Sequence, residues 1–424
     1  MIEWNDTERA IAEAVRDFVD REIRPHLDSL EHGDHRNGEI SPYDVLRKLY
    51  STFGLDVMAR ESFKKRIERE RESADRDGSG EPAKQRDQGE GRQDGADSFL
   101  MLALIELCRV SPGLTTAMGV SLGLAAGTIM SRGTVEQKER WGGDLLAMDK
   151  IGAWAITEPD AGSDAFGGMR TTVRRDGEDY LLSGQKTFIT NGPFADTIVV
   201  YAKLGDGATA WRDRRIMTFV LDSGMPGLTQ SAPLRKMGIH ASPTGQLFFD
   251  DVRLTPDRLL GSADEAADAG RTSARSNFTS ERVGMAAMAL GVISECLDLS
   301  VAYAKQRTLW DKPIGDLQLI QLKLADMEVA RMNVQNLVFR AIEMGRAGKT
   351  PTLAEASAVK YYASQAAFDV AMDAVQLFGG NGYMAEYHVE QLARDAKSFL
   401  IYAGSNEVQI THIAKDLLRR EGSR

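Results

Sequence analysis

The stretch TTVRRDGEDYLLSGQKTFITNG, residues 171–192, decides the fold of this chain. Short apolar runs alternate with polar residues, and Asp and Gly interrupt them, a pattern typical of strands joined by a tight turn. Similar runs continue to about residue 256, as in ADTIVVYAKL, RRIMTFVLDS and GQLFFDDVRL. We therefore predict an antiparallel β domain over residues 151–260.

Helical patterns precede this region. Between residues 5 and 60, apolar residues such as Ile11 and Val15 recur at helical spacing, and the pattern resumes over residues 99–148. We predict an N-terminal α-helical domain over residues 1–150.

Residues 64–97 interrupt the N-terminal helical pattern. They are rich in charged residues and carry a single large apolar residue, Ile67. Such a composition buries too little surface to offset the entropy of the chain. We predict an insertion whose middle is a mobile loop.

Helical patterns also follow the β region. After a linker of small residues near 262–276, long helical patterns run to the end of the chain. They are sufficient for a helix bundle, which we predict over residues 275–424.

Composition excludes several classes of function. The chain has 62 acidic and 52 basic residues, a formal charge of -10, whereas nucleic-acid binding requires a concentrated basic surface. Cys108 and Cys296 lie far apart in apolar helical patterns, which predicts buried, reduced thiols. The six histidines show no spacing typical of a metal site, so we expect none.

The N-terminus and the apolar stretches bear on location. The start MIEWNDTERAIAEAV resembles neither a secretion signal nor a transit peptide. The apolar stretch 118–130 is shorter than the roughly 20 residues that a membrane span needs, and we interpret it as a buried helix. We expect a cytoplasmic protein without a membrane span.

Three motifs carry possible chemistry, each with an alternative. GNGYMA, residues 380–385, matches a dinucleotide fingerprint but follows a helical pattern instead of a strand, which argues against that site. WAITEPDAGSDAFGG, residues 154–168, is a loop that lets backbone amides approach a phosphate or a ring, or an ordinary turn. In GQKTFITNG, Phe188 and Thr190 share one face of a strand, beside a cofactor ring or simply in the core.

Five motifs in order, AITEPDAGSDAFGG, GQKTFITNG, KMGIHASPTGQLFFDDVRL, KPIGDLQLIQLKLADM and QLFGGNGYMAEYHVEQLARDAK, resemble the acyl-CoA dehydrogenase family over nearly the whole chain. The resemblance implies a multi-domain α+β fold with an N-terminal helical domain, a middle β domain and a C-terminal four-helix bundle. It also implies FAD as cofactor, a homotetramer built as a dimer of dimers, an acyl-CoA substrate from fatty acid β-oxidation, and electron-transferring flavoprotein as partner.

The resemblance assigns residues to FAD. Ile156 and Thr157 match positions that meet the flavin ring, Phe188 replaces a usual Trp beside it, and Thr190 matches the hydroxyl near N5. Further matching positions are Gly162, Ser163, Ser405 and Glu407, with Arg307, Trp310, Gln318, Gln376, Gly379 and Gly380 for the adenine half in a neighbouring subunit. Leu309 and Asp311 depart from the usual pattern there, which leaves the pyrophosphate contact open.

The stretch FLIYAGSNEVQ, residues 399–409, lacks the catalytic Glu that many family members carry at the position of Ala403. In others the Glu lies upstream, directly before an Arg, where this chain has Glu281 and Arg282. We predict Glu281 as the base that removes the α proton, while the β hydrogen leaves as hydride to flavin N5. The Ala403 N–H is the expected donor to the thioester carbonyl. The expected substrate contacts are Ser163, Arg282 and Tyr402.

Alternatives remain at this stage. Glu281 after Thr279 or Ser280 is also what a helix N-terminus favours, and Glu407 is the next candidate for the base. At the level of function, the alternatives are a non-catalytic subunit of a mixed oligomer and an acyl-CoA oxidase. Acyl chain length and branching are open.

Overall fold

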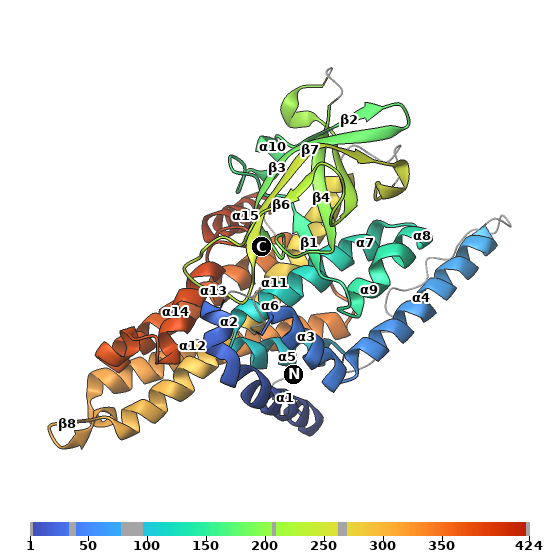
Figure 1. Cartoon of the computed structure of the whole chain (residues 1–424). Helices are drawn as coiled ribbons and strands as arrows, with labels where there is room; N and C mark the ends of the chain where they lie inside the picture. The colour runs from blue at the N-terminus through green and yellow to red at the C-terminus, as the bar shows by residue number, and fades with distance from the viewer. Residues whose placement is uncertain (1–2, 34–39, 78–95, 206–208, 262–268, 421–424) are drawn as a thin grey trace.

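The structure is a computed structural model that describes residues 3–33, 40–77, 96–205, 209–261 and 269–420. Helices form one half of the molecule, and a sheet caps them at one end (Figure 1). The predicted fold class, with helical N- and C-terminal domains around a middle sheet domain, is confirmed.

The N-terminal helices surround a core of their own. A capping box at Asn5 begins the first helix, in which the N–H of Glu8 donates to the Asn5 side chain and the N–H of Asn5 donates to the Glu8 carboxylate. Residues such as Phe18, Leu46 and Leu107 meet in the buried cluster. The helices are α1 (Asp6–Phe18), α2 (Leu27–His32), α3 (Pro42–Thr52), α4 (Leu55–Asp77), α5 (Ala96–Cys108), α6 (Pro112–Gly119), α7 (Gly127–Arg132), α8 (Val135–Gln137) and α9 (Gly143–Leu146), with the π-helical segments η3 (Val120–Ala126) and η4 (Lys138–Gly142).

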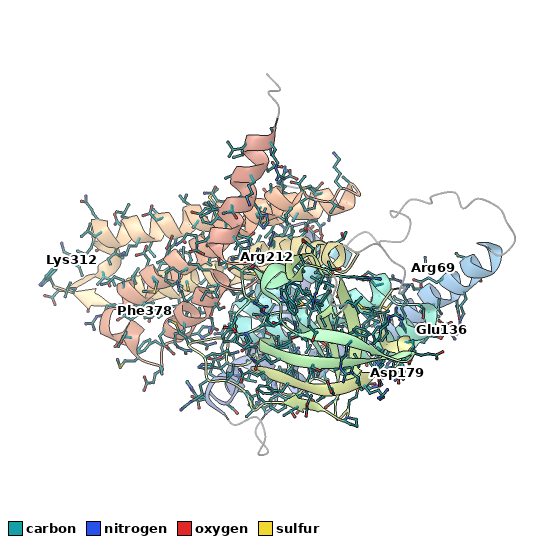
Figure 2. The ribbon with its side chains drawn as sticks, turned by 90° about the horizontal axis from the view of Figure 1, so that it is seen from above. Arg69, Glu136, Asp179, Arg212, Lys312 and Phe378 are labelled. Atoms are coloured by element: carbon teal, nitrogen blue, oxygen red, sulfur yellow. The ribbon has the colours of Figure 1, made fainter. Side chains whose placement is uncertain are left out.

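The prediction of an insertion over residues 64–97 is wrong for its first part, because α4 is helical through residue 77. Ile67 is only 4% exposed, since the helix packs along α8 and α9. Ion pairs hold the charged side chains to this surface, including Lys138 to Glu70 at 2.6 Å and Arg71 to Glu139 at 2.8 Å. Arg69 and Glu136 lie at this edge of the molecule (Figure 2). The predicted mobile middle falls on residues 78–95, outside the described residues.

The middle domain is one seven-stranded sheet in the order β1-β4-β2-β3-β7-β6, with β5 paired to β4. The 171–192 stretch forms the β2–β3 hairpin, and β3 also pairs antiparallel with β7. The prediction of an antiparallel sheet needs one correction, because β1 and β2 both pair parallel with β4. The strands are β1 (Gly152–Ala155), β2 (Thr172–Asp176), β3 (Asp179–Thr190), β4 (Thr197–Leu204), β5 (Ile216–Asp222), β6 (Leu228–Gln230) and β7 (Thr244–Leu254), and the short helix α10 (Ala165–Gly168) follows β1.

The C-terminal domain is a bundle of long helices. α11 (Ala269–Gln306) packs against α12 (Gln318–Arg346) and α13 (Leu353–Phe378), and α13 contacts α14 (His388–Phe399) and α15 (Asn406–Arg419). The predicted linker near 262–276 is wrong for its second half, because α11 already begins at Ala269. A small hairpin of β8 (Thr308–Leu309) and β9 (Lys312–Pro313) joins α11 to α12, and the 3-10 helix η8 (Gly379–Tyr383) follows α13.

Two further expectations concern the apolar helices. Cys108 and Cys296 are buried, free cysteines, as predicted. Two helical stretches, residues 112–132 and 277–306, are long and apolar enough to cross a membrane, but the apolar part of each is mostly buried inside the protein. Burial of this kind is what core helices show. Residues 118–130 lie in the first of them.

Candidate active site

The turn between α14 and α15 presents a backbone donor. Ala403 has φ 57 and Gly404 has φ 84, a left-handed pair that reverses the chain. The Ala403 carbonyl accepts hydrogen bonds from Arg282 Nε at 3.3 Å and from Gln409 Nε2 at 3.1 Å. Within the described part of the chain no group accepts a hydrogen bond from the Ala403 N–H. The residue is 8% exposed, so this donor is largely shielded from water.

Helix α11 brings a carboxylate and a guanidinium to this turn. The helix begins at Ala269, so Glu281 lies about three turns inside it and does not serve as an N-terminal residue. The capping interpretation of Glu281 is therefore wrong. Arg282 is 3% exposed and donates from Nη1 to Ser357 Oγ at 3.2 Å, besides its bond to the Ala403 carbonyl.

The electrostatics of Glu281 suit a base. Its side chain is partly buried, and burial raises the pKa of its carboxyl from 4.5 to about 7, although the charges of Arg282 and Lys360 favour the anion. Lys360 is buried, donates to Asn406 Oδ1 at 2.8 Å, and has its pKa lowered to about 8 by burial. A carboxyl whose pKa lies near neutrality accepts protons efficiently there.

The other nearby acid differs. Glu407 is exposed in the first turn of α15, and its own backbone N–H and the Ser405 hydroxyl lower the pKa of its carboxyl. It is an ordinary surface anion with low proton affinity. Of the two candidate bases, the environment favours Glu281.

Tyr402 adds a neutral hydroxyl. It donates to Met288 Sδ at 3.9 Å, and burial raises its pKa well above the ordinary value. The charge of Glu281 contributes to this rise, so the two side chains belong to one neighbourhood. Gly284, one turn beyond Glu281, borders open space, because a Cβ there would meet no atom within 4 Å.

The β domain supplies the opposite part of the candidate site. Glu158 accepts from the buried ammonium of Lys186 at 2.8 Å, and the same ammonium donates to the Ile156 carbonyl at 3.0 Å. The Thr187 N–H donates to the Thr157 carbonyl at 2.9 Å, which ties β3 to the loop after β1. Gly162 and Ser163 of that loop are exposed, and within the described residues neither makes a hydrogen bond or an ion pair with Glu281.

Phe188 does not lie in the core, which was the alternative to its predicted place beside a cofactor ring. It is 68% exposed and has φ 56, at an irregularity in the pairing of β3 with β7. A left-handed backbone is unfavourable for a bulky residue, so its surroundings must hold the ring outside the sheet. Thr190 is half-buried two residues further on and pairs with Thr244.

A third group lies at the far end of the helix bundle, near the β8–β9 hairpin. Tyr303 stacks on Phe378 with ring centroids 4.0 Å apart, which brings the end of α11 to η8. Figure 2 shows Lys312 of the hairpin far from Asp179 of the sheet. Among the described residues, no hydrogen bond or ion pair joins this third group to Phe188 or Thr190. Its exposed members are Arg307, Trp310, Gln318, Gln376, Gly379 and Gly380.

Sequence reasoning missed the residues that support the site. Lys186 and Glu158 both lie inside quoted motifs, and a Lys on an apolar strand is the signal that would have indicated a buried ion pair. Lys360 and Gln409 lie in ordinary helical patterns, without a comparable signal. Among the described residues, no group of three or more His, Cys, Asp or Glu is placed to hold a metal ion.

Comparison with known proteins gives a consistent result. Three family models match: the acyl-CoA dehydrogenase N-terminal domain over residues 86–149, the middle domain over 153–252 and the C-terminal domain over 268–418. The chain is 35% identical to an acyl-CoA dehydrogenase of Bacillus subtilis, over 95% of this chain and 96% of that protein.

Further similarity is found in Megasphaera elsdenii. The chain is 38% identical to its short-chain specific acyl-CoA dehydrogenase, over 77% of this chain and 83% of that protein. The solved structure of butyryl-CoA dehydrogenase from the same organism superimposes with a TM-score of 0.82 at 31% identity, over 99% of this chain and 100% of that chain.

Proposed function

Because the chain belongs to the acyl-CoA dehydrogenase family and is an oxidoreductase of that kind, we propose that it oxidises an acyl-CoA thioester to the trans-2-enoyl form with Glu281 as base. The observation that carries this proposal is the pairing of a carboxyl whose pKa is near 7 with the Ala403 turn, joined through Arg282.

Glu281 is the group that takes the proton. An α proton of a thioester is weakly acidic, so the carboxylate that removes it needs a raised proton affinity, which burial in α11 gives to Glu281. The neighbouring Arg282 and Lys360 keep part of the population ionised at neutral pH.

The Ala403 N–H is the group that stabilises developing charge. As the α proton leaves, negative charge grows on the thioester oxygen, and a donor already aimed at it requires no reorganisation. The Ala403 carbonyl accepts two hydrogen bonds and the Tyr402 N–H donates to the Ser398 carbonyl at 3.1 Å, so contacts on both sides of the Tyr402–Ala403 peptide restrain the direction of the Ala403 N–H before substrate binds.

The residues present fit FAD. An exposed aromatic ring at Phe188 and the hydroxyl of Thr190 lie on the β side, beside the loop of Ile156 and Thr157. When bound, FAD supplies the acceptor for the hydride that leaves the β carbon. Exposed Ser163 and the Ser405 and Glu407 end of α15 would complete the flavin end.

A second copy of the chain is part of the proposal. Arg307 and Trp310 are exposed, Trp310 by 78%, and they lie at the hairpin end of the bundle, where Lys312 is far from Asp179 of the sheet in Figure 2. We infer that they hold the adenine half of FAD bound mainly by a neighbouring subunit of a homotetramer. An exposed apolar face on α12 supports assembly there: Leu319, Leu322, Val329 and Met332.

The proposal includes electron-transferring flavoprotein as acceptor, a role in β-oxidation and a cytoplasmic location. The test is anaerobic titration of the purified, FAD-loaded protein with short, long and branched acyl-CoA thioesters. We expect bleaching of the flavin absorbance by at least one chain length, and reoxidation by electron-transferring flavoprotein faster than by oxygen. No bleaching across the whole panel would indicate a non-catalytic subunit, and fast reoxidation by oxygen would indicate an oxidase.

A further inference from the structure

Residues 236–244, KMGIHASPT, form a loop between β6 and β7 that has no role in the chemistry described above. We call it the latch loop. It seats on α14 through Asp395, which is fully buried and whose Oδ1 accepts the N–H of Ile239. Oδ2 of the same carboxyl accepts from Gln391 Nε2 at 3.3 Å. Ile239 has φ 48, an unfavourable conformation for a β-branched residue, so this contact is maintained against backbone strain.

The latch loop and α14 fit without spare room. A Cβ on Gly238 would lie 2.6 Å from the Arg394 carbonyl carbon and 2.7 Å from Asp395 Oδ1. Arg394 Nη1 donates to the Met237 carbonyl at 3.0 Å. Only glycine permits this approach. A single methyl group, added by Gly238→Ala, would therefore separate the latch loop from α14.

One end of the latch loop connects to β7, which pairs with the strand that carries Phe188 and Thr190. Lys236 Nζ donates to the Ile239 carbonyl and to Thr244 Oγ1, both at 2.9 Å, and so closes the loop on itself. Thr244 begins β7 and pairs with Thr190, two residues after Phe188. A shift of the loop therefore moves the strand that carries Phe188.

The other end of the contact leads to the Ala403 turn. Ser398 Oγ donates to the Asp395 carbonyl at 2.6 Å, and the Ser398 carbonyl accepts the N–H of Tyr402 at 3.1 Å. Ala403 is the next residue. Asp395 is thus one helical turn from the segment on which the catalytic N–H is built.

Charged groups from three domains surround this carboxyl. Glu31 of α2, which lies beside α14 in Figure 1, contacts His240 Nδ1 at 3.3 Å and Arg394 Nη1 at 3.5 Å. Burial first, and then the charge of Glu31, raise the pKa of Asp395 to about 7, while Arg394 favours its anion. Lys236 and His240 face it from the latch loop, Glu390 pairs with Arg394 on α14, and the His32 ring lies 6.2 Å from that of His240.

We propose that Asp395 is a positioning residue, which anchors the latch loop to α14 and thereby sets the spacing between the Phe188–Thr190 part of the site and the Ala403 turn. The proposal rests on the proposed function, since it assumes that these two parts hold one cofactor and one substrate. Asp395 touches neither of them and acts through Ile239 and Ser398.

The test compares Asp395→Ala with Asp395→Asn, which keeps an oxygen that accepts the Ile239 N–H. Backbone hydrogen exchange over residues 396–409 is measured on the full-length protein, together with turnover per bound FAD. We expect Asp395→Ala to speed exchange at Tyr402 and Asn406 and to lower turnover, each about 10- to 100-fold, because small misplacements of catalytic groups have such effects. Asp395→Asn should restore both to near the parent values.

Glu106→Ala is the matched control, because Glu106 is also buried and joins α5 to α1 through Arg16 at 2.8 Å, remote from the turn. It should lower thermal stability without changing exchange over 396–409 or turnover per FAD. If Asp395→Ala does not fold, Gly238→Ala opens the same contact without removing the carboxyl and should give the same exchange pattern.

Parent-like exchange over 396–409 in the folded Asp395→Ala protein, or in Gly238→Ala when that variant is needed, overturns the proposal. Loss of both exchange protection and turnover in Asp395→Asn as well would also overturn it, since the accepting oxygen is then not what matters. Hydrogen exchange is measured without substrate. The role proposed for Asp395 is therefore tested independently of whether Glu281 is the base.

Discussion

Glu281 and Glu407 flank the same turn, yet their surroundings shift the pKa of the carboxyl in opposite directions. In α11, burial raises the pKa of Glu281 to about 7, whereas at the start of α15 a backbone N–H and a hydroxyl lower that of the exposed Glu407. Glu407 is only four residues from Ala403, and Glu281 is more than a hundred residues away. Burial, and not nearness in the chain, therefore distinguishes the proposed base from the other acid.

We expect the largest effect when each of the two acids is neutralised in turn. Glu281→Gln should retain FAD and bind acyl-CoA but slow anaerobic flavin reduction about 10³-fold, because the proton acceptor is gone while the shape remains. Glu407→Gln is the matched control and should react at close to the parent rate. Equal rates for Glu281→Gln and the parent in a single turnover would show that the base lies elsewhere.

The base can also be moved. Adding Ala403→Glu to Glu281→Gln places a carboxylate at the turn itself, in a largely buried position that already tolerates a side chain at φ 57. We expect recovery of about tenfold over Glu281→Gln alone, with a changed preference for acyl chain length. Single-turnover rates across a panel of acyl-CoA lengths measure both, and no recovery would mean that the turn does not face the α carbon.

The pH dependence separates the two regions further. Below a pH of about 7 Glu281 becomes protonated, so the reduction rate should fall roughly tenfold per pH unit. Stability should change in the opposite direction. Because its folded-state pKa is raised above 4.5, the contribution of Glu281 to stability is fully present below about pH 4.5 and is lost progressively as pH rises to about 7.

Thermal unfolding of Glu281→Gln between pH 5 and 9 checks this sign. The variant should lack the decline in stability that Glu281 causes in the parent between about pH 4.5 and about pH 7. Glu407 has a lowered pKa, so any stability it contributes is lost only at acidic pH, below its unfolded value. An unchanged stability profile in Glu281→Gln would contradict the assigned pKa direction.

The smallest expected effect tests the cation between the two acids. The charge of Lys360 lowers the pKa values of both Glu281 and Glu407. Lys360→Met should move the midpoint of the rate profile upward by less than about one pH unit, a few-fold loss of rate at neutral pH. The exposed Glu407 is screened by solvent and should respond less. Titration of both carboxyls by NMR measures the difference, and a downward shift for Glu281 would be incompatible with the arrangement.

Sequence patterns alone were enough to predict the order of the domains and to indicate most of the candidate residues. Strand alternation in residues 171–192 and helical spacing around Val15 are local patterns, because the side-chain periods of strands and helices are properties of the backbone. The resemblance to the family, carried by motifs such as GQKTFITNG, then indicated the cofactor and the Glu281–Arg282 pair.

Only the tertiary structure decided the rest. Charge composition predicted an insertion from residue 64 onward, but α4 continues through Ile67 and buries it, since packing against α9 and ion pairs with distant residues outweigh local composition. The strand pattern left open whether Phe188 lies beside a cofactor ring or in the core, and the pairing irregularity turns it outward. The pKa of Glu281, the bond from Arg282 to Ala403 and the seat of Ile239 on Asp395 all join residues far apart in the chain. Desolvation and hydrogen-bond geometry exist only once the chain has folded, so no local pattern encodes them.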